Sequence, residues 1–295
     1  MKNSTIIIAH LALFIVQLLY AANYTIAKEV MPDYIAPKGI IFIRICFAVL
    51  MFWLLHAFFI KAEEIKRKDI PRLVLCGIFG VVINQICFFV GLNWTKPINA
   101  SIIMQITPIL VFIGTVFFLK EKFRLLNILG ILIGCAGAAL LIGYGQNISF
   151  STQGLKGDLY ILINAISYSV YFLIVKPLLQ KYHPIVVVKW IFTFGLLFAT
   201  PFTLPEMLQT EWNTLSPAIW GALAYILIGA TFLTYLLNAL ALSRLSPKVV
   251  GAYIYLQPIL ATIIAVLAGK DELTTIKMIT GMMIFVGVYL VSLKK

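Results

Sequence analysis

The sequence predicts an all-α integral membrane protein whose ten transmembrane helices form two inverted five-helix repeats. Of its 295 residues, 62% are hydrophobic and only 12% are charged, too little polar surface to cover a water-soluble domain. The chain also contains ten separate apolar runs, each close to the roughly 20 residues that a helix needs to cross a bilayer. One pattern of landmark residues then occurs twice, about 150 residues apart.

The ten apolar runs are joined by short loops that leave no room for a soluble domain. The first run resembles a signal peptide, but it continues past any cleavage point, so we expect it to be a span. The expected spans are residues 5–27, 38–60, 71–93, 97–119, 125–144, 157–178, 184–205, 216–241, 247–269 and 275–293.

The repeated pattern consists of two prolines, a glutamate after the following apolar stretch, and a glycine nine residues later. It comprises Pro97, Pro108, Glu121 and Gly130 in the first copy, and Pro247, Pro258, Glu272 and Gly281 in the second. Because five spans per copy is an odd number, the second copy enters the membrane from the opposite side. We expect one membrane domain with repeats at 1–145 and 155–295, and inverted repeats of this kind build transport pathways at their interface.

The net charge of +12 follows the expected topology. With the N-terminus inside, most of the 23 Lys and Arg residues fall on the inner side. Such an excess on the cytoplasmic side sets orientation. We therefore expect both termini in the cytoplasm, a location in the inner (cytoplasmic) membrane, the lipid bilayer and a small-molecule substrate as partners, and no nucleic-acid partner.

The prolines mark the centre of the expected pathway. A proline inside a helix frees the carbonyl four residues earlier, and in lipid that carbonyl must face protein or water. A simple packing kink is the alternative. The residues assigned to the pathway at these positions are Gln105, Thr107 and Pro108 in one copy, and Tyr253, Tyr255, Gln257 and Pro258 in the other.

Amide and phenol side chains inside the spans form the rest of the expected pathway. Polar groups at this depth tend to face a bundle interior or a cavity. Interhelical hydrogen bonds and an interfacial aromatic belt are the alternatives. The assigned residues are Tyr20, Asn23, Tyr24, Asn84, Gln85, Asn164, Tyr168, Tyr171, Tyr235 and Asn238.

A second group of residues is assigned structural or anchoring roles. Arg44 either extends to the nearest membrane surface or anchors a substrate carboxylate or a neighbouring helix end. Gly130, Gly134 and Gly281 belong to small-residue stripes that pack helices, within one chain or between two, so both a monomer and a homodimer remain open. Glu121 and Glu272 end the repeated apolar stretches.

Several function classes find no support in the sequence. No Asp or Glu lies in the interior of an expected span, which disfavours a carboxylate-based proton or sodium antiporter. The four cysteines have no metal-type spacing. No P-loop, zinc motif or serine-nucleophile motif occurs. We expect no enzyme activity, no cofactor and no metal.

Three segments carry a resemblance to the drug/metabolite transporter superfamily, specifically to ten-helix proteins with two EamA domains. They are IFIRICFAVL at 41–50, NASIIMQITPILVFIGTVFFLKEKF at 99–123 and VGAYIYLQPILATIIAVLAGKDEL at 250–273. The resemblance implies ten helices, cytoplasmic termini, and a cavity lined mainly by helices 1, 3, 4, 6, 8 and 9. It also implies export or exchange of small metabolites, often amino acids. Tyr20-Ala21 departs from the tryptophan-glycine pair frequent in the family.

We therefore expect a secondary transporter that exports or exchanges amino acids or related polar and amphipathic solutes by alternating access. Another metabolite or drug class, such as nucleosides or sugars, is an alternative. A membrane sensor or scaffold without transport is an alternative of a different class.

Overall fold

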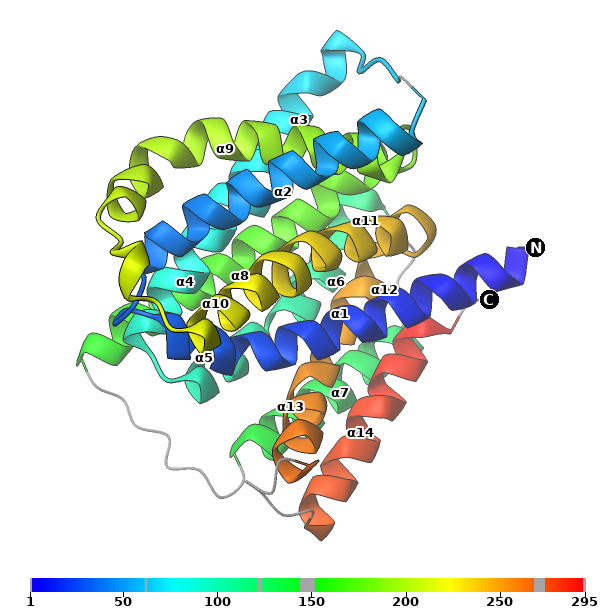
Figure 1. Cartoon of the computed structure of the whole chain (residues 1–295). Coiled ribbons are helices and arrows are strands. Elements are labelled where there is room, and N and C mark those ends of the chain that lie inside the picture. Colours follow the sequence, from blue (N-terminus) through cyan, green and yellow to red (C-terminus); the bar gives the residue numbers. More distant parts are fainter. Residues whose placement is uncertain (1, 62, 121–123, 144–151, 268–273, 294–295) are drawn as a thin grey trace.

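The computed structural model describes residues 2–61, 63–120, 124–143, 152–267 and 274–293, and within these ranges it is helical without strands (Figure 1). The first half contains α1 (Lys2–Val30), α2 (Pro37–Phe59), η1 (Arg67–Asp69), α3 (Ile70–Gly77), η2 (Ile78–Ile83), α4 (Asn84–Trp94), α5 (Pro97–Met104), α6 (Thr107–Leu119) and α7 (Leu125–Gly143). The second contains α8 (Thr152–Leu179), α9 (Pro184–Leu208), η3 (Trp212–Thr214), α10 (Pro217–Ala224), η4 (Tyr225–Leu233), α11 (Thr234–Arg244), α12 (Pro247–Ala252), η5 (Tyr253–Tyr255), α13 (Leu256–Leu267) and α14 (Thr275–Ser292).

In the described ranges, 9 helical stretches are long and apolar enough to cross a membrane. They correspond to nine of the ten expected spans. The remaining one, in α7, is a shorter apolar helix, Leu125–Leu141, and α7 ends beside residues outside the described ranges. A multi-pass helical membrane protein is therefore confirmed, whereas the count of ten stays a prediction.

Both halves show the same succession of elements. In each half, two continuous helices precede a helix interrupted by a π-helical segment, η2 in the first half and η4 in the second. A helix broken near a proline follows, and then a final helix. The sequence did not predict the π-helical segments.

Helices of one half pack against helices of the other, so the halves share one interior. The main pairs are α2 with α9, α4 with α8, α1 with α11, and α7 with α14. Figure 1 shows α2 beside α9, and these two run antiparallel. Lys38 at the start of α2 forms a 2.9 Å ion pair with Glu206 near the end of α9. At the other end of the pair, Lys189 Nζ lies 3.4 Å from His56 Nδ1.

Two lysines that lie 148 residues apart, Lys28 and Lys176, cap helix ends, and their separation is close to that of the sequence repeat. Lys28 Nζ donates to two carbonyls at the end of α4, at 2.7 and 2.9 Å. Lys176 Nζ donates to two carbonyls at the end of α11, at 2.5 and 2.7 Å. The final carbonyls of a helix have no intrahelical partner and carry partial negative charge, which an ammonium group stabilises. The repeat thus preserves a contact between elements as well as a residue pattern.

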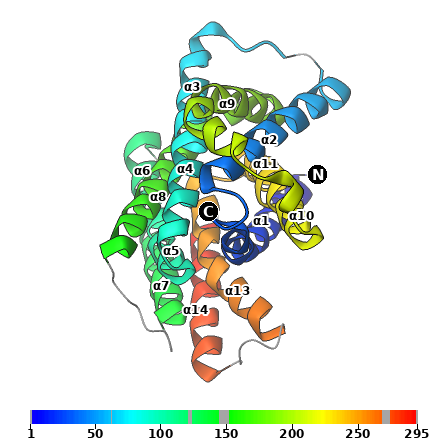
Figure 2. The same cartoon turned by 60° about the vertical axis from the view of Figure 1, so that its left-hand side comes forward.

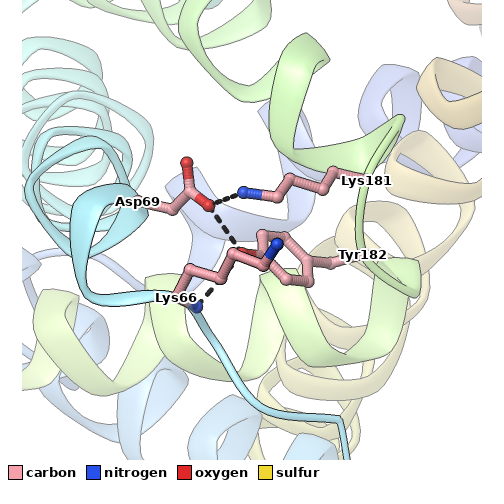
Figure 3. Close-up of polar contacts among 4 residues, drawn as sticks. All are labelled: Lys66, Asp69, Lys181 and Tyr182. Carbon is pink, nitrogen blue, oxygen red and sulfur yellow. Dashed lines mark hydrogen bonds and ion pairs between the residues drawn. The ribbon is translucent and has the colours of Figure 1, made fainter.

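A polar cluster ties the segment before α3 to the turn between α8 and α9 (Figure 3). Asp69 forms an ion pair with Lys181 and accepts a 2.6 Å hydrogen bond from the hydroxyl of Tyr182. The same hydroxyl accepts a 3.1 Å hydrogen bond from the backbone N–H of Lys66. The contact with Asp69 raises the pKa of Lys181 above its ordinary value. The two halves are therefore joined at this end of α2 and, through Lys38 and Glu206, at the other end.

The glycines of α7 allow its backbone to approach that of α14 within the same chain. A Cβ placed on Gly287 would lie 2.6 Å from the carbonyl oxygen of Gly130 and 2.6 Å from the backbone nitrogen of Gly134. Gly281 is different, because the atom nearest to its Cβ would be 3.9 Å away. The close approach therefore occurs at Gly287, six residues beyond Gly281, the landmark glycine of the repeat.

Replacing Gly287 with alanine should destabilise the protein, because the added Cβ would meet backbone that has to shift. We expect a loss of roughly 1–3 kcal/mol, as found for overpacked interiors, seen as a lower melting temperature in detergent. Gly281→Ala is the matched control on the same helix and should change the melting temperature little. Equal melting temperatures for the two variants would contradict this packing.

Candidate functional site

A narrow cavity lies between helices of both halves, and amide, phenol and guanidinium groups belong to its lining. Figure 2 shows α4 and α8 on the left of the bundle and α1 and α11 on the right, and each pair supplies lining residues. The cavity offers about 60 Å³ to water-sized molecules. It is lined by Tyr20, Asn23, Tyr24, Arg44, Asn84, Gln85, Phe88, Phe89, Met104, Asn164, Tyr168, Tyr235 and Gln257. The structure thus gathers many of the amides and phenols assigned from the sequence around one space.

One side of the cavity is held by side chains that bond to backbone in and beside η2. The hydroxyl of Tyr235 donates to the carbonyl of Gly80 at 2.6 Å, and its distance to Asn84 Oδ1 is 3.4 Å. The amide nitrogen of Asn164 donates to the carbonyl of Asn84 at 2.7 Å. A π-helical segment changes the spacing of the backbone hydrogen bonds and leaves carbonyls in need of other donors. The bilayer core holds no water that could supply them. Helices of the second half therefore satisfy carbonyls of the first.

Another side of the cavity joins α1 to α13. Gln257 Nε2 donates to Gln17 Oε1 at 2.8 Å, and the hydroxyl of Tyr24 lies 3.4 Å from Gln257 Oε1. All three side chains are buried. Gln257 directly precedes Pro258, so the second proline position contributes to the cavity through its neighbour.

Arg44 is buried, with 4% of its surface exposed, and it bonds to η4 instead of extending to the end of α2. Its Nε donates to Thr231 Oγ1 at 2.6 Å, and its Nη2 donates to the carbonyl of Ala230 at 3.1 Å. The guanidinium carbon lies 4.4 Å from the ring centroid of Phe89. Of the two interpretations of this residue, the contacts favour an anchor over snorkelling.

At both prolines the α-helix is locally interrupted within a single membrane-spanning stretch. α5 ends at Met104 and α6 begins at Thr107, so Pro108 lies in the first turn of α6. A proline there costs no intrahelical hydrogen bond, because first-turn N–H groups have no partner. In the second half, the 3₁₀ segment η5 separates α12 from α13, and Pro258 lies in the first turn of α13.

The remaining assigned residues lie outside the cavity lining. They are Gln105, Thr107, Pro108, Tyr171, Asn238, Tyr253, Tyr255 and Pro258. Gln105 Nε2 donates to the carbonyl of Ser101 in its own segment at 2.9 Å. Asn238 contacts a residue of the cavity lining, because its amide nitrogen donates to the hydroxyl of Tyr168 at 3.2 Å.

The aromatic members of this group pack against other helices. Tyr253 bonds to His10 at 2.7 Å. The ring of Tyr255 lies against Gly134, which gives that glycine its packing partner, and the ring of Tyr171 lies against Gly80. Glu121 and Glu272 lie outside the described residues, so their anchoring role stays a prediction.

Sequence reasoning missed the apolar part of the cavity. Phe88, Phe89 and Met104 line it, but they stand in long apolar runs where nothing separates a cavity-facing residue from a lipid-facing one. Gln17 was also missed. Its signal was available, because an amide in an apolar run is the feature that singled out the other members.

Comparison with known proteins gives a consistent result. A family model described as "EamA-like transporter family" matches residues 7–143 and 155–293. An uncharacterized transporter of Archaeoglobus fulgidus is 25% identical, over 97% of this chain and 98% of that protein. A probable terminal-alkyne amino-acid exporter of Streptantibioticus cattleyicolor is 24% identical, over 77% of this chain and 74% of that protein.

A solved structure described as "Crystal structure of protein" superposes with a TM-score of 0.77 at 19% identity. The match covers 98% of this chain and 96% of that one. It establishes a shared fold.

Tyr235→Phe tests the bond between η2 and α11. The change leaves the carbonyl of Gly80 without its donor, and we expect a loss of about 1–2 kcal/mol as a lower melting temperature in detergent. Tyr289, which is 64% exposed on α14, is the matched control for loss of a phenol hydroxyl. A Tyr235→Phe variant as stable as Tyr289→Phe would argue against the bond.

Proposed function

We propose that this chain, which belongs to the EamA-like transporter family, is a secondary transporter that exports or exchanges small metabolites by alternating access. Amino acids and related amphipathic solutes are the proposed substrates. The observation that carries the proposal is the cavity, which both halves line and whose lining brings amides, phenols and a guanidinium together inside a largely apolar helix bundle. Polar side chains at membrane depth are costly and mark solute pathways.

The size of the cavity supports alternating access. The centres of water-sized molecules have only about 60 Å³ available in the cavity, which is therefore narrow. Residues of both halves line this space and would move apart when a larger solute enters.

The helix arrangement supports ten spans in two inverted five-helix repeats. The two halves have the same succession of elements, and α2 runs antiparallel to α9. α1 begins and α14 ends at the same end of the molecule (Figure 1). Together with the excess of Lys and Arg on that side, this supports cytoplasmic termini and a location in the cytoplasmic membrane.

The choice of amino acids rests on the lining and on one relative. Among the described residues, the cavity contains amides, phenols and a guanidinium but no carboxylate, which disfavours organic cations. The relative from Streptantibioticus cattleyicolor is named as a probable amino-acid exporter. Nucleosides and sugars, which amides and phenols also bind, are the alternative substrates.

Purified protein in liposomes tests the proposal. Liposomes loaded with one unlabelled amino acid at a time should accumulate the same radiolabelled amino acid in a saturable way, and protein-free liposomes should not. If no amino acid shows counterflow and a nucleoside or a sugar does, the proposed substrate class is wrong.

Gln257→Leu should lower counterflow about tenfold or more, because it removes a polar lining group and its bonds to Tyr24 and Gln17. Gln105→Leu is the matched control, a buried glutamine at the proline break of the other half, outside the cavity. Its effect should be clearly smaller. Equal losses in variants with unchanged melting temperatures would argue that this cavity is not the pathway.

A further inference from the structure

Arg44 places a positive charge inside the membrane, and no carboxylate among the described residues pairs with it. Among the described residues, the ion pairs are Lys38 with Glu206 and Lys181 with Asp69, so Arg44 has no carboxylate partner there. The groups that it contacts are a hydroxyl, a carbonyl and an aromatic ring. Removing a charge from water costs several kcal/mol unless an opposite charge or full hydrogen bonding compensates.

The other buried cation of the bundle has a different environment. Lys189 is equally buried, also with 4% exposure, but two carboxylates line the hollow beside it, Glu63 and Glu64. Its ammonium also lies 4.2 Å from the ring centroid of Trp53. Among the described residues, Lys189 therefore has acids nearby, and the cavity beside Arg44 has none.

The contacts of Arg44 leave part of its guanidinium unused. Nε and one N–H of Nη2 are engaged, and Nη1 makes no hydrogen bond with the described residues. Phe89 covers the guanidinium, and the side chain lines the cavity. A guanidinium carries five N–H donors in a planar fork that matches a carboxylate. Arg44 is therefore held in position by Nε and Nη2, while its other N–H donors are available to a ligand.

Unpaired amides face the same cavity. Both polar atoms of the Gln85 side chain lack a hydrogen-bond partner in the described part of the chain, although the residue is only 2% exposed. Asn23 Oδ1 and Asn164 Oδ1 are also buried without a partner there. Such groups are costly unless a ligand or water satisfies them. Gln85 offers a donor for an anion, and the asparagine oxygens offer acceptors for an ammonium or hydroxyl group.

We propose that Arg44 binds the carboxylate of the transported solute, so that the cavity selects amphipathic carboxylates. This inference rests on the proposed function and adds the chemical group that is recognised. The bound carboxylate neutralises the buried guanidinium, and aromatic side chains such as Phe88 and Tyr24 contact the apolar body of the solute. An ammonium group is tolerated but not required, because the lining supplies neutral acceptors and no acid.

Four related probes test the inference on the purified full-length protein. They are L-phenylalanine, 3-phenylpropionate without the amine, L-phenylalaninamide without the carboxylate charge, and phenethylamine without the carboxyl group. Binding is measured as concentration-dependent thermal stabilisation in detergent. We expect the two carboxylates to bind within about threefold of each other, and the other two probes at least about tenfold more weakly, as for loss of a charge-assisted hydrogen bond.

Arg44→Gln should abolish this preference, and Arg44→Lys should retain part of it because the charge remains without the fork. Lys189→Gln removes an equally buried cation outside the cavity and should leave the preference unchanged. If the arginine variants fail to fold, the relative binding strengths of the four probes on the wild-type protein still test whether the carboxylate is recognised.

Three outcomes overturn the inference. Wild-type protein that binds the amide as tightly as the acid would show that the carboxylate is not recognised, and a preference that survives Arg44→Gln would assign it elsewhere. Binding of none of the four probes also overturns the inference. The proposed function has its own test: it fails if no amino acid shows counterflow in liposomes.

Discussion

A polar group inside the bilayer must find its partner within the protein, and this constraint explains where the two halves meet. The π-helical segments and the breaks near Pro108 and Pro258 disturb the regular backbone ladder in both halves. Side chains from the opposite half supply donors, as Tyr235 does for the carbonyl of Gly80. Asn164 does the same for the carbonyl of Asn84. The polar interior is therefore located between the halves and not within either one.

The position of the polar cavity groups between the two halves suits a transport pathway. Glycine contacts between α7 and α14, together with polar ties at both ends of α2, hold the halves to each other. The amides and phenols of the cavity are distributed over helices of both halves. A relative movement of the lining helices would change the shape of the cavity. Arg44 joins α2 to η4 across this boundary, so a solute bound to Arg44 would contact both halves.

The apolar runs and the repeat predicted a helical membrane protein, and the family match supports the assignment made from Pro108, Pro258 and their surroundings. The amide and phenol pattern predicted much of the cavity lining, because a buried polar side chain stands out in an apolar span. The π-helical segments were not predictable, since a shift in hydrogen bonding leaves no mark on an apolar pattern. Phe89 could not be distinguished from a lipid-facing phenylalanine, and nothing in the sequence ranked Gly287, where the close contact with α7 occurs, above Gly281.

The central claim is that this cavity opens to one side of the membrane and then to the other. It is tested most directly by a single cysteine at position 20, a lining position, in a variant whose four native cysteines are replaced. In vesicles of known orientation, a membrane-impermeant thiol reagent should modify Tyr20→Cys when it is added from either side. Modification from one side only, or from neither, would contradict the account.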